Sequence, residues 1–218
     1  MKRRSCALLL ILLVAGCMSK PAPRWMEVSY KLLETYKQDF LSGRVQTITD
    51  SHFRRAVDEI KNSGDMDLLG KAWLTRMALQ TAILAPADGG DYPKIEAVQP
   101  VPGNRAFYLF LKGDQTDVSL LTESYRSCWT AFQKGDAAKA AAAISAIQDP
   151  LSRLIASGLA VRKGLATEAI LLNAVDNASR NGWKQALLVW LERLHAFHEA
   201  AGETNKAAAV SARMDLIR

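Results

Sequence analysis

Apolar residues recur at intervals of three and four along almost the whole chain beyond Pro23. This spacing places them on one face of an α-helix, and no segment alternates apolar and polar residues between turn signals as a strand would. We therefore predict an all-α fold of antiparallel helical hairpins. The apolar series that mark the expected helices span residues 26–40, 53–60, 66–84, 105–112, 117–134, 137–147, 151–158, 165–175, 187–197 and 207–217.

Two of these series carry start signals, and one has an unusual apolar distribution. Thr49 or Asp50 is placed to cap the series 53–60, and Asp149 followed by Pro150 gives the favoured order of cap and first helical residue. The series 66–84 is apolar around more of its circumference than the others. We expect that helix to lie at the centre of the fold.

A segment rich in proline and glycine, residues 86–104, interrupts the helical pattern. It holds four prolines out of the 7 in the chain, together with three glycines. We expect a loop there, and a long loop inside a compact domain is usually functional or mobile. Phe107, Tyr108 and Phe110 follow directly. They form either a buried anchor helix for the end of the loop or, with Tyr92, a candidate binding edge.

A glycine stands five residues before an alanine at three places in the C-terminal half. The pairs are Gly135/Ala140, Gly164/Ala169 and Gly202/Ala207. Such a glycine can end one helix with a left-handed cap, and a small alanine lets the next helix approach closely. Of the two intervals between these three glycines, one is shorter and one is longer than the ~34-residue period of tetratricopeptide repeats. Residues 120–218 thus resemble degenerate tetratricopeptide hairpins, with an irregular helical bundle as the alternative.

The N-terminus has the pattern of an export signal. Lys2, Arg3 and Arg4 precede an uncharged apolar run at 6–14, which is too short to cross a bilayer core of ~30 Å. A basic start, a short apolar run and small residues are typical of a secretory signal peptide. We assign residues 1–16 to this leader.

The leader ends in Val-Ala-Gly-Cys at residues 14–17, which resembles the bacterial lipobox. The resemblance implies cleavage before Cys17 and acylation of that residue by diacylglyceryl and palmitate-type chains, which would hold the protein in the membrane. The residue after Cys17 is Met18, whereas an Asp at that position would favour retention in the inner membrane. The resemblance therefore implies that the protein is anchored in the outer membrane, facing the periplasm. An ordinary signal peptide cut elsewhere is the alternative.

The processed chain would then consist of a Pro-containing tether at 17–24 and a single all-α domain at 25–218. Cleavage removes three basic residues and halves the formal surplus of +6. Because nucleic-acid binders usually carry a strongly basic face, we expect no nucleic-acid partner. Cys128 lies on the apolar face of the series 117–134, which predicts a buried core thiol.

Few residues suggest chemistry. Glu192 and His195 form a single Glu-x-x-His, whereas a di-iron site needs two such motifs and two further glutamates. Glu123 followed by Ser124 resembles the Glu-Ser of lytic transglycosylases, without the Gly-Leu-Met-Gln type of segment expected downstream. Phosphate loops, nucleophile elbows and zinc spacings do not occur. We assign no catalytic residue, metal ligand or cofactor.

These observations favour a membrane-tethered helical scaffold or adaptor over an enzyme. Its partners would be the membrane, through the lipid anchor, and proteins or peptides of the cell envelope. The alternative is an envelope enzyme that acts on peptidoglycan, with Glu123 or the pair Glu192 and His195 as its candidates.

Overall fold

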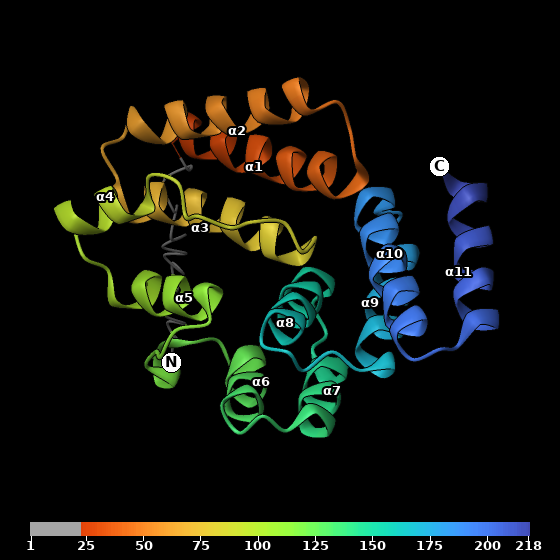
Figure 1. Cartoon of the computed structure of the whole chain (residues 1–218). Helices are drawn as coiled ribbons and strands as arrows, with labels where there is room; N and C mark the ends of the chain where they lie inside the picture. Colours follow the sequence, from red (N-terminus) through yellow and green to blue (C-terminus); the bar gives the residue numbers. More distant parts are fainter. Residues whose placement is uncertain (1–22) are drawn as a thin grey trace, which may run out of the picture.

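The computed structural model describes residues 23–218, and every regular element in that range is a helix (Figure 1). The predicted all-α class is therefore confirmed. The elements are α1 (Arg24–Ser42), α2 (Gln46–Lys61), α3 (Met66–Ala82), α4 (Tyr92–Val98), α5 (Pro102–Lys112), the 3-10 helix η1 (Val118–Leu120), α6 (Glu123–Gln133), α7 (Ala137–Ala146), α8 (Pro150–Arg162), α9 (Glu168–Arg180), α10 (Lys184–Ala200) and α11 (Thr204–Ile217).

The predicted signal peptide at 1–16, the lipidated Cys17 and most of the tether at 17–24 lie outside the described residues. Arg24, which we assigned to the tether, is the first residue of α1. Within residues 23–218, no helix combines the length and the apolar character that crossing a bilayer requires.

The centre of the fold is formed by α3 and α8, which pack against each other. Buried residues lie all around α3, as the sequence predicted for this helix. The crossing is unusually close at Gly158 of α8, where an added Cβ would lie 2.1 Å from the carbonyl oxygen of Thr81. Only a residue without a side chain permits this approach.

The N-terminal hairpin of α1 and α2 also contacts the C-terminal part of the chain, through α10 (Figure 1). The indole of Trp183 donates a hydrogen bond to Gln38 Oε1 at 3.1 Å, and that of Trp190 donates to the Ala82 carbonyl at 2.9 Å. These bonds satisfy two indole donors that burial would otherwise leave unpaired. They join the two ends of the fold along a seam between α1, α3 and α10.

The C-terminal half consists of repeat-like helical hairpins. Gly135, Gly164 and Gly202 lie in the turns of the pairs α6–α7, α8–α9 and α10–α11. Their φ angles are 65°, 74° and 72°, so all three have the left-handed conformation that the sequence predicted.

The second hairpin departs from the expected register. In α7 the fully buried Ala140 lies four residues after the capping residue. Because α9 is capped by Thr167, further from its glycine, the equivalent position is the fully buried Leu171, while Ala169 faces solvent and Leu172 is 48% exposed. The prediction that Ala169 packs closely is wrong, and so is the placement of the whole apolar series 165–175 on one buried face, because the start of the helix decides which side chains point inward.

The expected loop at 86–104 is largely helical, which corrects the prediction. Residues 92–98 form α4, and α5 already begins at Pro102. Pro93 and Pro102 both stand in the first turn of a helix, where no N–H is needed for the helical bonding pattern. The prolines therefore start helices here instead of excluding them.

Two glycines hold the remaining loop against the core. Gly89 and Gly90 have φ angles of 80° and 55°. An added Cβ would lie 2.8 Å from the ring of Tyr108 at Gly89 and 2.4 Å from the ring of Trp73 at Gly90. The glycines thus let the backbone pass directly over two aromatic rings.

Two further helix predictions need correction, and one core prediction is confirmed. The series 117–134 divides into η1 and α6, because Leu121 and Thr122 are extended, with ψ angles of 155° and 152°. Helix α2 begins at Gln46, so Thr49 lies inside it and caps nothing. Cys128 is fully buried, as predicted, and burial raises the pKa of its thiol to about 12.

Candidate functional site

A groove of about 450 Å³, lined by both apolar and polar residues, opens at the seam where α1, α2, α3 and α10 meet. We call it the Arg44–Arg76 groove. Sites between separately packed parts of a fold are common places for ligands and partners. Its lining consists of Phe40, Gly43, Arg44, Gln46, Thr49, Asp50, Arg76, Gln80, Ile83, Ala85, Pro86 and Gln185.

The hydrogen-bonding groups of this lining are mostly left for solvent. The ion pairs of both arginines are long, from Arg44 to Asp39 at 3.5 Å and from Arg76 to Asp50 at 3.6 Å. Within residues 23–218, the side chains of the three lining glutamines form no hydrogen bond with another group. Guanidinium forks and amides of this kind are suited to carboxylates and peptide backbones.

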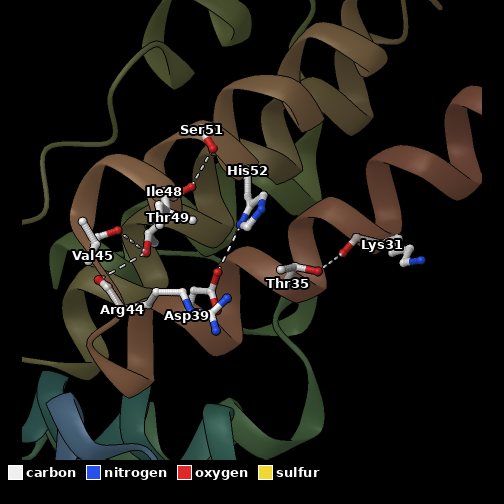
Figure 2. A network of polar contacts seen from close by, with 9 residues as sticks. All are labelled: Lys31, Thr35, Asp39, Arg44, Val45, Ile48, Thr49, Ser51 and His52. Atoms are coloured by element: carbon white, nitrogen blue, oxygen red, sulfur yellow. Dashed lines mark hydrogen bonds and ion pairs between the residues drawn. The ribbon is translucent and has the colours of Figure 1, made fainter.

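Arg44 is part of a polar network between α1 and α2 (Figure 2). Asp39 is 9% exposed and lies between two basic groups, with His52 Nδ1 at 3.1 Å from Oδ2 and Arg44 Nε at 3.5 Å from Oδ1. A buried carboxylate needs such partners. The network positions Arg44 at the start of α2, with its side chain 59% exposed.

Arg76 is positioned by aromatic rings. Its guanidinium lies 5.0 Å from the ring centre of Phe53 and 6.0 Å from that of Trp73. Cation–π contacts at such distances stabilise the pair by ~0.5–1 kcal/mol at exposed sites. They hold the guanidinium of Arg76, which lines the groove, against the two rings.

A second cavity, of about 520 Å³, shares Ala85 and Pro86 of its lining with the groove. Leu84 lines it and has a φ of 57°, the one left-handed residue other than glycine within 23–218. Leu84 N–H bonds the Thr81 carbonyl and Ala85 N–H bonds the Gln80 carbonyl, which is a helix C-cap normally completed by glycine. This backbone costs a leucine about 1–2 kcal/mol.

Of the two cations that line this second cavity, Lys112 pairs with Asp114 at 2.9 Å, and Arg162 caps a helix together with the neighbouring Lys163. Arg162 Nη1 donates to the Leu111 carbonyl at 2.7 Å, and Lys163 Nζ donates to the Gly113 carbonyl at 2.8 Å, both at the C-terminal end of α5. Burial lowers the pKa of the Arg162 guanidinium. Because these charges offset the negative ends of helices, they are less available to a partner than Arg44 and Arg76.

The four aromatic residues singled out in the sequence come together, but mostly inside the molecule. Tyr92 is 2% exposed and Phe110 is fully buried, whereas Phe107 and Tyr108 are half-buried. Tyr92 packs against Tyr108 with ring centres 4.8 Å apart, and Phe107 stacks on Tyr125 at 5.8 Å. The arrangement is that of an anchor helix, the first of the two interpretations given above.

The residues weighed for catalysis are spread over separate surfaces. Glu123 is exposed at the start of α6, beside a cavity of about 620 Å³ whose lining contains no aromatic side chain on which a sugar ring could stack. Glu192 pairs with Arg218 at 3.1 Å, and His195 lies 3.3 Å from Glu199. The peptidoglycan-enzyme alternative stays a prediction.

One cluster contains groups of the kind that bind metals. Oxygen and nitrogen atoms of Glu168, His198 and Glu203 lie within 4.8 Å of one another. Lys206 bridges both carboxylates, at 3.1 Å from Glu168 and 3.0 Å from Glu203, and thus already supplies a cation there. His198 is 3% exposed, and its Nδ1 lies 2.6 Å from the carboxylate of Glu203, which links α10 to the start of α11.

Sequence reasoning missed the Arg44–Arg76 groove. Its residues come from four segments that have no common motif, and only the seam brings them together. No family model, curated protein or solved structure matches the chain.

Proposed function

We propose that this chain is a lipid-anchored helical adaptor of the bacterial cell envelope, which binds an extended peptide segment of a protein partner in the Arg44–Arg76 groove. The observation that carries the proposal is the combination, in that groove, of two guanidinium groups that form only long ion pairs with three glutamine amides that form no side-chain hydrogen bond within residues 23–218. The leader and the lipobox-like residues 14–17 support the anchor.

The chemistry of the lining supports an acidic partner segment. Each lining arginine has only one long ion pair, from Arg44 to Asp39 at 3.5 Å and from Arg76 to Asp50 at 3.6 Å. Part of each guanidinium is therefore left for a carboxylate of a partner. The glutamine amides can each pair with a backbone N–H and a carbonyl of an extended chain. Beside the groove, Val45 and Ile48 are 63% and 44% exposed and offer apolar contact.

The repeat-like hairpins and the anchor support an adaptor role. Tetratricopeptide-type hairpins commonly present rigid surfaces to peptides, and this half of the chain would hold α10 rigidly at the seam. An anchor in the outer membrane, facing the periplasm, would raise the effective concentration of the groove near other envelope proteins. A weak contact is then sufficient.

Two measurements test this function. Cells fed labelled palmitate should label the wild-type chain but not a Cys17→Ser variant, which should leave the membrane fraction. Affinity capture of the wild type should return a defined envelope protein. Removal of two charge-assisted contacts, each ~1.5–3 kcal/mol, should lower that recovery at least about tenfold in the double variant Arg44→Gln/Arg76→Gln.

The matched control is Arg54→Gln/Arg55→Gln, which removes two exposed arginines of α2 outside the groove lining. Its recovery of the partner should equal that of the wild type. Equal loss in both double variants would show a general charge effect and would remove the groove from the proposal.

A further inference from the structure

The first two turns of α1 carry large side chains that the core does not use. Trp25 is half-buried, Met26 is 39% exposed and Tyr30 is 67% exposed. Along α1, the continuous apolar core begins only at Leu33. These three residues lie outside that core, and their exposed surfaces are left for an external contact.

Their arrangement suits a lipid surface. Met26 and Tyr30 are one turn apart on the same flank of the helix, and Trp25 lies at its first turn. Exposed Arg24 and Lys31 outnumber the exposed carboxylate of Glu27. Tryptophan and tyrosine settle at the level of lipid headgroups, where neighbouring lysine and arginine reach phosphate groups.

The length of chain before α1 identifies the surface. Residues 18–23 separate Cys17 from the start of α1, and a Pro-containing stretch of that length extends at most ~20 Å. The first turns of α1 are thus held within reach of whatever membrane holds Cys17. Val98 and Leu216, which are 75% and 88% exposed, lie on α4 and α11 and have no comparable link to the anchor.

We propose that the first two turns of α1 dock onto the leaflet that holds Cys17, with Trp25, Met26 and Tyr30 at headgroup level. This proposal rests on the lipid anchor proposed above. Docking fixes one end of a 19-residue helix, which is ~28 Å long at ~1.5 Å per residue. The Arg44–Arg76 groove begins at the other end of that helix. Docking therefore sets the distance between the membrane surface and the groove in which a partner binds.

The test attaches the lipid chemically, so that it does not depend on acylation in the cell. Residues 17–218 are coupled through Cys17 to a maleimide phospholipid, since the buried Cys128 does not compete for the reagent. The product is placed in vesicles of phosphatidylethanolamine and phosphatidylglycerol with brominated acyl chains. Bromine quenches tryptophan only at short range, so the quenched fraction reports insertion of Trp25.

Part of the wild-type fluorescence should be quenched, and Trp25→Phe should lose that part. Met26→Ser/Tyr30→Ser should reduce the quenching, while the matched exposed substitution Val98→Ser leaves it unchanged. Equal quenching of the wild type and Trp25→Phe would overturn the docking. A cell in which palmitate fails to label the chain would instead overturn the anchor and leave the vesicle result intact.

Discussion

At the residue scale, the stability of the fold depends most sharply on Gly158. An added methyl group would lie 2.1 Å from the Thr81 carbonyl oxygen and force α3 and α8 apart. We expect Gly158→Ala to lower the free energy of unfolding by about 2–4 kcal/mol, as overpacked cores do, measured by urea denaturation.

Gly103 provides the control for that substitution. It lies in α5 with nothing within 4 Å of an added Cβ. Gly103→Ala should therefore raise the free energy of unfolding by about 0.5–1 kcal/mol, through helix propensity alone. A loss at Gly103 as large as that at Gly158 would show that the close crossing is not the cause.

Single residues were predictable where the signal is local. The order Asp149–Pro150 gave the start of α8, and the Asp149 side chain does accept a bond from Ser152 N–H at 2.7 Å. Cys128 followed from its place on an apolar face. Arg44 and Arg76 carried no such signal, because their role depends on neighbours that are distant in the sequence.

At the element scale, Glu203 fastens α11 onto α10. Hydrogen bonds from Lys206 and then from His198 lower the pKa of the Glu203 carboxyl below its ordinary 4.5. A lowered folded-state pKa contributes stability above the unfolded value, and this contribution is lost as the pH falls through the folded value. The wild type should therefore lose stability below about pH 4.5.

Glu203→Gln should be less stable than the wild type at about pH 6 and should lose less on acidification to about pH 3, as measured by urea midpoints across that range. Lys206→Met, which removes the stronger partner, should flatten the profile in the same direction. Parallel pH profiles for the wild type and both variants would contradict the assignment.

Helix boundaries were predictable only where the glycines and prolines of the local sequence allow a single interpretation. Gly135 and Gly202 lie directly before capping residues, so alanines five positions on are buried. The capping residue Thr167 lies three residues after Gly164, and the same rule fails there. Pro93 and Pro102 were interpreted as breakers because proline can also begin a helix, and only tertiary packing decides between the two.

At the scale of the whole molecule, the periodicity of apolar residues predicted the class of the fold. It did not predict the contact that joins the N-terminal hairpin to the C-terminal half. The contact between α1 and α10 joins residues as far apart as Gln38 and Trp183. No local pattern encodes such a pairing, and the candidate groove exists only because of it. Membrane position and partner binding would both act through α1, which would have the proposed tether at one end and has the groove at the other.

The central claim is that a partner occupies the Arg44–Arg76 groove. The most direct measurement is photo-crosslinking in cells, with a photoactivatable residue at Gln80 inside the groove and at the exposed Thr130 of α6 as the reference. We predict one discrete envelope adduct from position 80, absent from position 130 and lost when Arg44→Gln/Arg76→Gln is added. The same adducts from both positions, unchanged by the double variant, would contradict the account.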